Sequence, residues 1–163
     1  FKADLEYSLK ESENEIFNNF YYRVFPELES IEEITDINLQ LDGIDKILKF
    51  KNGKTIMVDE KKRRKDYGDI LIEEYSDYEN RKVGWIGKHK KTDYIVYAVM
   101  PSRKVYLLPF LLLQKAWITN YFSWKKKYKR KFAYNKNYIT SNIPVPVDVL
   151  LAAITDEIQQ EFY

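Results

Sequence analysis

Ionisable side chains stand inside two short apolar stretches that are separated by a single turn. Asp45 lies in the first stretch, and Asp59, Glu60 and Lys61 lie together in the second. Burying an ionised carboxylate among apolar residues is costly, and two facing carboxylates repel unless a cation lies between them. Carboxylate oxygens suit Mg²⁺, which keeps several of its waters and takes few ligands from the protein. The pattern therefore favours a site for a divalent cation in this part of the chain.

The turn between the two stretches is the sequence Lys51-Asn52-Gly53-Lys54. An Asn-Gly pair flanked by apolar runs is typical of a β-hairpin. We therefore expect residues 41–50 and residues 55–61 to form two antiparallel strands. Residues directly opposite each other in such a pair share one side of the sheet, so the geometry of the turn decides which side chains meet.

Two registers of this hairpin are compatible with the turn sequence. A two-residue turn places Asp45 opposite Glu60, with Lys62 on the same side. A three-residue loop that ends on a glycine in the left-handed conformation places Asp45 opposite Asp59, with Lys61 on the same side. Because a one-residue slip moves every side chain to the other face, the two registers predict different groups of charged residues.

The Gly-Ile-Asp strand, the Asn-Gly hairpin and the Asp-Glu-Lys strand resemble the PD-(D/E)XK nuclease superfamily. Its members include Holliday-junction resolvases, restriction enzymes and many phage-encoded nucleases. The resemblance covers roughly residues 10–100, and Ile44 stands in place of the proline of the family pattern. It implies a restriction-endonuclease-like fold, in which helices flank a mixed central sheet. It also implies a hydrolase that cuts phosphodiester bonds with Mg²⁺ or Mn²⁺.

The resemblance assigns a role to each acidic residue of the hairpin. In the superfamily, one Asp lies beside a (D/E)-x-K triplet on the next strand, and two acids with a backbone carbonyl hold the metal. Carried over, Asp45, Asp59 and Glu60 become the candidate metal ligands and catalytic acids. The triplet lysine orients or activates the attacking water. Lys61 is favoured over the lysine that follows it, because phage nucleases with an Asp-Glu-Lys triplet vary that later position. A glutamate of the first helix often joins the site, and Glu13 is the candidate here, with a solvated first-turn acid as the alternative.

The remaining elements follow from apolar spacing and from helix-start signals. Ser12 and Glu15 have the spacing of a capping box, and the apolar residues after them predict a first helix over residues 13–25. We further expect strands at 70–75, 94–100 and 104–108, a strand or short helix at 31–39, and helices at 110–124 and about 146–160. This order predicts one α/β or α+β domain over residues 1–163, with a mixed sheet and a basic segment at 124–137.

The charge of the chain is unevenly distributed. The net charge is only +2, but residues 46–136 carry 24 basic and 9 acidic side chains, whereas residues 1–45 carry 3 and 12. A basic middle segment predicts a polyanionic partner, and we expect DNA in preference to RNA. The alternative is a solvated surface whose charges pair across the fold. The candidate contacts are Arg63, Arg64, Lys65, Lys125, Lys126, Lys127, Lys129, Arg130 and Lys131.

Composition excludes several other classes of site. The chain has no cysteine and a single histidine, His89, which excludes disulfides, thiolate chemistry and multi-histidine metal centres. Its five glycines form neither a G-x-G-x-x-G nor a Walker-type phosphate loop. The longest apolar stretch, at 105–113, falls short of the roughly 20 residues that span a bilayer. We therefore expect a cytoplasmic protein without membrane contact, of phage or mobile-element origin if the resemblance holds, and a homodimer is left open.

The sequence supports two functions from different classes. The first is a metal-dependent nuclease that acts on DNA. The second is a catalytically silent protein that keeps the nuclease fold and binds nucleic acid or inhibits a partner. The carboxylates and the lysine favour the first function, because a silent site has no reason to keep charged residues within apolar strands.

Overall fold

The computed structural model describes residues 2–159, which form two β-sheets and four α-helices. The first sheet contains, in spatial order, β1 (Leu28–Glu33), β2 (Lys46–Phe50), β3 (Thr55–Arg63), β6 (Tyr94–Val99) and β7 (Lys104–Pro109). The second contains β5 (Lys82–Val83), β4 (Asp69–Asp77), β9 (Ile139–Pro146) and β8 (Lys131–Tyr134). The helices are α1 (Lys2–Val24), α2 (Ile37–Leu41), α3 (Phe110–Lys127) and α4 (Val147–Ile158), with one 3₁₀ turn, η1 (Trp85–Gly87).

The first sheet is mixed, because β3 runs parallel to β6 while the other neighbouring pairs are antiparallel. A parallel pair needs a long crossover between its two strands. Here residues 64–93 supply that crossover, and they carry β4, β5 and η1 out to the second sheet before returning to β6. The centre of the first sheet is therefore joined to the second sheet by a segment that starts at the end of β3.

The β2–β3 hairpin adopts the register of the three-residue loop. The amide of Phe50 donates a hydrogen bond to the carbonyl of Lys54 at 2.9 Å, and Gly53 has a φ of +84°. Glycine adopts this left-handed conformation without steric cost, which explains its place at the end of the loop. The paired residues run from Lys49 opposite Thr55 to Lys46 opposite Val58, and the Asp45 amide also donates to the Val58 carbonyl at 2.9 Å, so Asp45 leaves the ladder beside Asp59. Of the two registers expected from the sequence, this one is confirmed.

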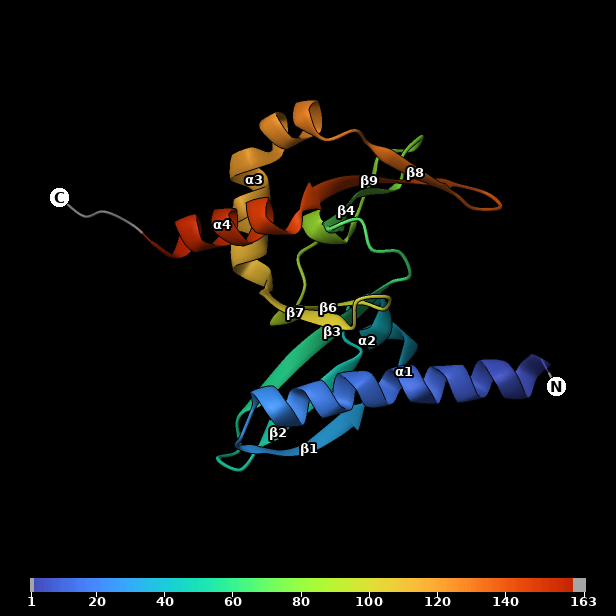
Figure 1. Cartoon of the computed structure of the whole chain (residues 1–163), viewed down its shortest axis with the longest axis vertical. Helices are drawn as coiled ribbons and strands as arrows, with labels where there is room; N and C mark the ends of the chain where they lie inside the picture. Colours follow the sequence, from blue (N-terminus) through green and yellow to red (C-terminus); the bar gives the residue numbers. More distant parts are fainter. Residues whose placement is uncertain (1, 160–163) are drawn as a thin grey trace.

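Helix α1 covers one face of the first sheet (Figure 1). Its buried residues Glu13, Phe17 and Tyr21 recur every four positions, which places them on one face of the helix. The helix ends ahead of Pro26, as predicted, but it begins at residue 2 rather than at residue 13. Residues 2–12 contain no glycine or proline and many good helix formers, so Ser12 lies inside the helix instead of capping it.

The other face of the first sheet packs against the second sheet, α3 and α4 (Figure 1). Ile95 of β6 shares this core with Ile72 of β4 and Ile143 of β9. Leu113 of α3 and Leu150 of α4 close the core from the far side, and all five side chains are fully buried. The two sheets are thus held together by one continuous apolar cluster, while α1 has a separate cluster on the opposite face.

The α+β class is confirmed, and most expected elements occur within a few residues of their predicted bounds. Residues 41–45 do not begin a strand, because the chain completes α2 and turns at Gly43 before β2 starts. The basic segment 124–137 is divided between the last turn of α3 and strand β8. The second sheet escaped prediction because β9 contains two prolines, which argue against a strand. The expected end of the last helix, near residue 160, lies outside the described residues.

No helix within residues 2–159 is both long enough and apolar enough to cross a membrane.

Candidate active site

Asp45 and Asp59 face a pocket of about 270 Å³ on the side of the first sheet away from α1. Asp45 immediately precedes β2, while Asp59 and Lys61 lie on β3 two residues apart, so both β3 side chains point to the same face. We call this space the carboxylate pocket. Its lining residues are Gln40, Leu41, Gly43, Asp45, Asp59, Glu60, Lys61, Glu73, Trp85, Lys88 and Lys90.

Asp45 is half-buried, and none of the ion pairs within residues 2–159 involves it. Its Oδ2 accepts one hydrogen bond, from the backbone amide of Glu60 at 2.6 Å. Burial raises the pKa of the Asp45 carboxyl to about 6; the bond from Glu60 opposes this rise, and the negative charges of Asp59 and Glu60 add to it. Asp45 therefore brings to the carboxylate pocket a charge that no ion pair within residues 2–159 compensates, and the same holds for Glu73 at its rim.

Asp59, in contrast, is neutralised from two sides. It is only 3% exposed, and the Nζ of Lys61 lies 3.3 Å from its Oδ1. The Nζ of Lys90 lies 2.9 Å from its Oδ2. The structure thus brings together three of the residues expected from the hairpin, Asp45, Asp59 and Lys61, and adds one that the sequence did not single out.

Lys90 comes from the loop after η1, 31 residues beyond Asp59. Its side chain crosses Gly43, where an added Cβ would lie 2.7 Å from the Lys90 Cδ. The Thr92 hydroxyl donates a hydrogen bond to the Gly43 carbonyl at 2.7 Å and fixes the loop there. Burial lowers the pKa of the Lys90 ammonium, while the charge of Asp59 acts in the opposite direction. In the sequence near Asp45, the only residue that indicates this approach of Lys90 is Gly43, which has no side chain to block it.

Trp85 forms the wall of the carboxylate pocket behind the two lysines. The Nζ of Lys61 lies 5.4 Å from the centre of its ring, and the Nζ of Lys90 lies 5.8 Å from it. The amide of Trp85 donates to the Glu73 carboxylate at 3.1 Å. Gln114 of α3 donates to the carbonyls of residues 86 and 88, both at 2.9 Å. Strand β4 and helix α3 therefore hold the segment that carries Trp85 and Lys90.

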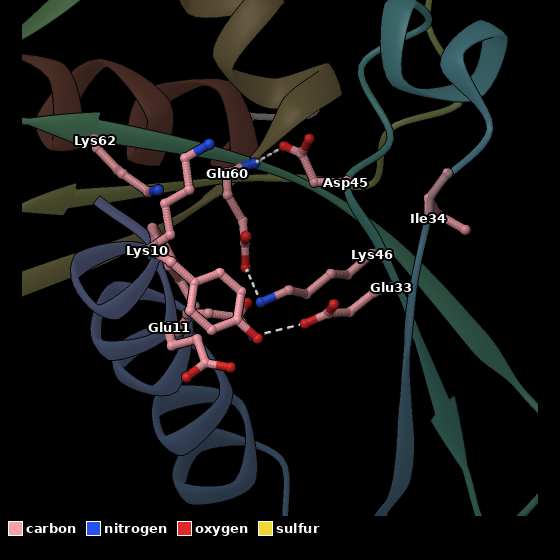
Figure 2. A pocket seen from close by; sticks show the side chains of 11 residues that line it. Lys10, Glu11, Glu33, Ile34, Asp45, Lys46, Glu60 and Lys62 are labelled. Atoms are coloured by element: carbon pink, nitrogen blue, oxygen red, sulfur yellow. Dashed lines mark hydrogen bonds and ion pairs between the residues drawn. The ribbon is translucent and has the colours of Figure 1, made fainter. Parts of the chain in front are cut away.

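Glu60 points the other way, toward α1. Its carboxylate lies 3.0 Å from the Nζ of Lys46 and accepts a 2.6 Å hydrogen bond from the Tyr21 hydroxyl. Figure 2 shows Glu60 and Lys46 pointing at each other in a pocket of about 480 Å³, into which Lys62 also projects. Asp45 lines this helix-side pocket as well. The structure therefore does not bring the Glu60 carboxylate to that of Asp59, although both residues were candidate metal ligands.

Glu13 lies apart from the candidate acids of the hairpin. It is 4% exposed, and its two oxygens accept hydrogen bonds from Arg64 at 2.8 and 3.1 Å. These bonds lower the pKa of the Glu13 carboxyl. Glu13 lines neither the carboxylate pocket nor the helix-side pocket. The expected helix acid is thus an ion-pair partner of a basic residue that was itself expected to contact nucleic acid.

The predicted nucleic-acid contacts occupy two places in the structure. Arg63 ends strand β3 and residues 64–65 lie in the bend after it, while residues 125–127 form the exposed last turn of α3. Lys129 is exposed, but Arg130 makes two hydrogen bonds to the buried Glu74, at 2.7 and 2.8 Å. Lys131 begins β8, an edge strand of the second sheet, and lies near residues 63–65. Arg130 thus has a structural partner, whereas lysines 125–127 and 129 make no ion pair within residues 2–159.

The donor atoms of the carboxylate pocket match the requirements of Mg²⁺ better than those of zinc. Within residues 2–159, no three or more His, Cys, Asp or Glu side chains are grouped to hold a metal ion. Mg²⁺ is commonly held by one or two carboxylates and keeps several waters, whereas structural zinc needs four nitrogen or sulfur ligands. Asp45 and Asp59 satisfy the first requirement, and the uncompensated charge of Asp45 favours a cation beside it.

Comparisons of this chain with protein-family models, curated proteins and solved structures found no match. What the carboxylate pocket can do therefore has to be judged from its own residues.

Proposed function

We propose that this chain is a divalent-metal-dependent nuclease of the PD-(D/E)XK type that hydrolyses phosphodiester bonds in DNA. The observation that carries the proposal is that Asp45, Asp59 and Lys61 line one pocket beside the hairpin, with the Lys61 Nζ 3.3 Å from Asp59. An acid without a counter-ion beside a second acid is costly in a folded protein unless the site serves a cation.

Each residue of the pocket has a defined part in this proposal. Asp45 and Asp59 would hold Mg²⁺ together with a backbone carbonyl. When bound, Mg²⁺ supplies Lewis-acid polarisation of the scissile phosphate and a bound water of lowered pKa. The Lys61 ammonium orients the attacking water and stabilises negative charge that develops on the phosphate. Trp85 lies beside Lys61 and limits the directions in which its ammonium can point.

A second candidate function is favoured by one observation. Both oxygens of Asp59 already have ammonium partners, Lys61 and Lys90, so the protein itself supplies two positive charges at the pocket. Such a pocket would suit a protein that keeps the fold and binds a phosphate group without turnover. The two functions differ in whether a divalent ion is required.

The test is cleavage of labelled single- and double-stranded DNA by the purified chain, with and without Mg²⁺ or Mn²⁺. We expect cleavage only with a divalent ion, and we expect it to be lost in Asp45→Asn and in Lys61→Met. Lys62→Met is the matched control, because this lysine neighbours Lys61 but projects toward α1. Wild-type activity in Asp45→Asn or Lys61→Met, or cleavage by the wild type in EDTA, would contradict the proposal. Circular dichroism establishes that each variant is folded.

A further inference from the structure

A second hollow of about 410 Å³ joins two segments that lie far apart in the sequence. We call it the basic groove. One side comes from the end of β3 and the turn after it, and the other comes from β8 of the second sheet. Its lining residues are Arg63, Arg64, Lys65, Tyr67, Leu71, Lys131, Phe132, Ala133 and Asn142. Both sides contain residues that were expected from the sequence to contact nucleic acid, Arg63, Arg64 and Lys65 on one side and Lys131 on the other.

The fold holds the two sides together through Asp69. Its Oδ1 lies 3.2 Å from a guanidinium nitrogen of Arg63, and its Oδ2 lies 3.9 Å from the Nζ of Lys131. The floor of the basic groove is the outer face of the second sheet, where Leu71 and Asn142 line it. Their sequence neighbours on β4 and β9 point the other way, into the core beneath α3 and α4. The groove is therefore built on a rigid support.

Positive charge exceeds negative charge in this groove. Four of its nine lining residues are basic and none is acidic. Arg63 and Lys131 share Asp69, and Arg64 pairs with Glu13, while Lys65 makes no ion pair within residues 2–159. Two carboxylates therefore face four cations. The excess suits the singly charged phosphates of a nucleic-acid backbone.

Two exposed aromatic residues line the groove, and the ring of Tyr67 lies among its cations. Tyr67 is 61% exposed and Phe132 is 41% exposed. The Nζ of Lys131 lies 4.7 Å from the ring centre of Tyr67, and the guanidinium of Arg63 lies 5.7 Å from it. Phe132 packs edge-on against Tyr78, with ring centres 5.1 Å apart, which fixes its orientation. Exposed rings next to cations are the arrangement by which proteins stack unpaired bases while they track the backbone.

The basic groove and the carboxylate pocket lie along the same side of strand β3. Alternate residues of a strand point to the same face, so Arg63 follows Asp59 and Lys61 along one side of β3. Four residues of strand span about 13 Å. A DNA strand that reaches the carboxylate pocket can therefore extend into the groove over only a few nucleotides.

The geometry points to the basic groove as a binding site for an unpaired stretch of DNA. Its bases stack on Tyr67 and Phe132, and its phosphates lie against Arg63, Lys65 and Lys131. In a duplex the faces of the bases are covered by the neighbouring base pairs of the stack, so a duplex cannot use these rings. The further conclusion that the substrate is single-stranded, or has an unpaired end, rests on the proposed nuclease function; the binding itself does not.

The test measures binding of fluorescein-labelled (dT)₁₂ and of a 12-base-pair duplex by anisotropy, in EDTA so that no cleavage occurs. We expect the wild type to prefer (dT)₁₂. Each stacked base contributes roughly 1–3 kcal/mol, so Tyr67→Ala and Phe132→Ala should each weaken (dT)₁₂ binding by about 5- to 150-fold while duplex binding changes less than twofold. Tyr22→Ala is the matched control, since Tyr22 is an exposed ring on α1 outside the groove.

Tyr67 lies in an exposed turn, so its variant tests stacking even if Phe132→Ala disturbs β8. Unchanged (dT)₁₂ binding in Tyr67→Ala, or equal losses for (dT)₁₂ and duplex, would overturn the inference. Tighter binding of (rU)₁₂ than of (dT)₁₂ would overturn the choice of DNA. If the chain binds (dT)₁₂ as expected but does not cleave DNA, only the proposed nuclease function is contradicted. If it cleaves single-stranded and duplex DNA equally and Tyr67→Ala does not change the cleavage, only the binding site in the groove is contradicted.

Discussion

Asp45 and Asp59 face each other across one hairpin but have opposite electrostatic surroundings. Two lysine ammonium groups neutralise Asp59, whereas Asp45 has a backbone amide and no ion-pair partner within residues 2–159. The difference arises because Asp59 lies in the middle of β3 beneath the loop after η1, while Asp45 lies where the chain enters β2. Asp45 is therefore the acid at which we expect pH and added cations to act.

Asp45 should make the protein less stable as the pH rises. Its pKa is raised to about 6 in the folded chain from an ordinary value of 3.8, so the folded state binds more protons than the unfolded state between these values. Stability is thus lost as the pH rises from about 4 to about 6. In EDTA, Asp45→Asn should exceed the wild type by roughly 1–2 kcal/mol in unfolding free energy at pH 7, after allowance for solvent screening, and by almost nothing at pH 4.

Urea unfolding at several pH values measures this difference. Millimolar Mn²⁺ at pH 7 should stabilise the wild type and leave Asp45→Asn unchanged, because only a folded form that binds the ion gains from it. A stability gap that stays constant from pH 4 to pH 7 would rule out an elevated pKa at Asp45.

Lys90 should compete with a metal ion for Asp59. Its ammonium lies 2.9 Å from Asp59 Oδ2 and is almost fully buried, so a divalent ion that uses this oxygen must displace it. Lys90→Met keeps the length of the side chain and removes the charge. We expect Mn²⁺ to bind this variant roughly tenfold more tightly than the wild type, a difference of about 1.4 kcal/mol.

Calorimetric titration with Mn²⁺ provides the measurement. Lys91→Met is the matched control, because this neighbouring lysine is exposed and lines neither pocket that contains Asp45. Equal or weaker Mn²⁺ affinity in Lys90→Met would show that the ion does not use the oxygen that Lys90 contacts.

The sequence could predict Asp45, Asp59 and Lys61 as neighbours because their contact is local. All three residues lie within 17 positions of the sequence, and the turn signal together with the two-residue period of a strand is enough to bring them together. Lys90 could not be predicted in this way, because its approach to Asp59 depends on the crossover, η1 and α3. Glu60 illustrates the same limit, since its carboxylate is turned to α1 by partners on another element, Tyr21 among them.

At the scale of elements, a buried ion pair fixes the residue directly before strand β8 and adds to the backbone pairing of β8 with β9. Glu74 of β4 accepts two hydrogen bonds from Arg130, which directly precedes β8, and further bonds from Tyr121 and Ser141. Burial alone would raise the pKa of Glu74, but the bonds from Arg130 and Tyr121 outweigh it and lower the pKa. Arg130 therefore acts as a structural residue, although its sequence context is that of a phosphate-binding segment.

Arg130→Ala should lower the unfolding free energy by about 2–3 kcal/mol, because it leaves the Glu74 carboxylate buried without its cation. Lys129→Ala, at the exposed neighbouring position, should change it by less than about 0.5 kcal/mol. Denaturant titrations of the two variants give the comparison, and Glu74→Gln in the Arg130→Ala background should recover part of the loss. Equal stability of the two single variants would contradict a structural role for Arg130.

Elements with a clear apolar period, such as β6 and α3, were predictable from the sequence. Strand β8 was not, because all four of its residues are exposed and it lacks the buried alternate positions that mark a strand. The start of α1 was missed for a related reason, since residues 2–12 pack on nothing that would give them an apolar face. In both cases the missing signal is burial.

At the scale of the whole molecule, the acidic first part of the chain neutralises some of the basic middle. Glu13 pairs with Arg64, and Glu32 pairs with Lys49. Part of the charge asymmetry of the sequence is therefore internal, as the alternative reading of the charge pattern expected. The lysines at the end of α3 and the basic groove keep exposed positive charge after this pairing.

The pairing of β4 with β9 also has a consequence for a chain that is still being made. Ribosomes add roughly 5–20 residues per second, so strand β9 is synthesised about 4–16 s after Asp59. Until then β4 lacks its main neighbour in the second sheet. The segment that carries Trp85 and Lys90 is hydrogen-bonded to β4 and to α3, so its support is still incomplete. A nascent chain thus displays the hairpin acids long before their surroundings are assembled. The surroundings of the carboxylate pocket are therefore complete only when translation is nearly finished.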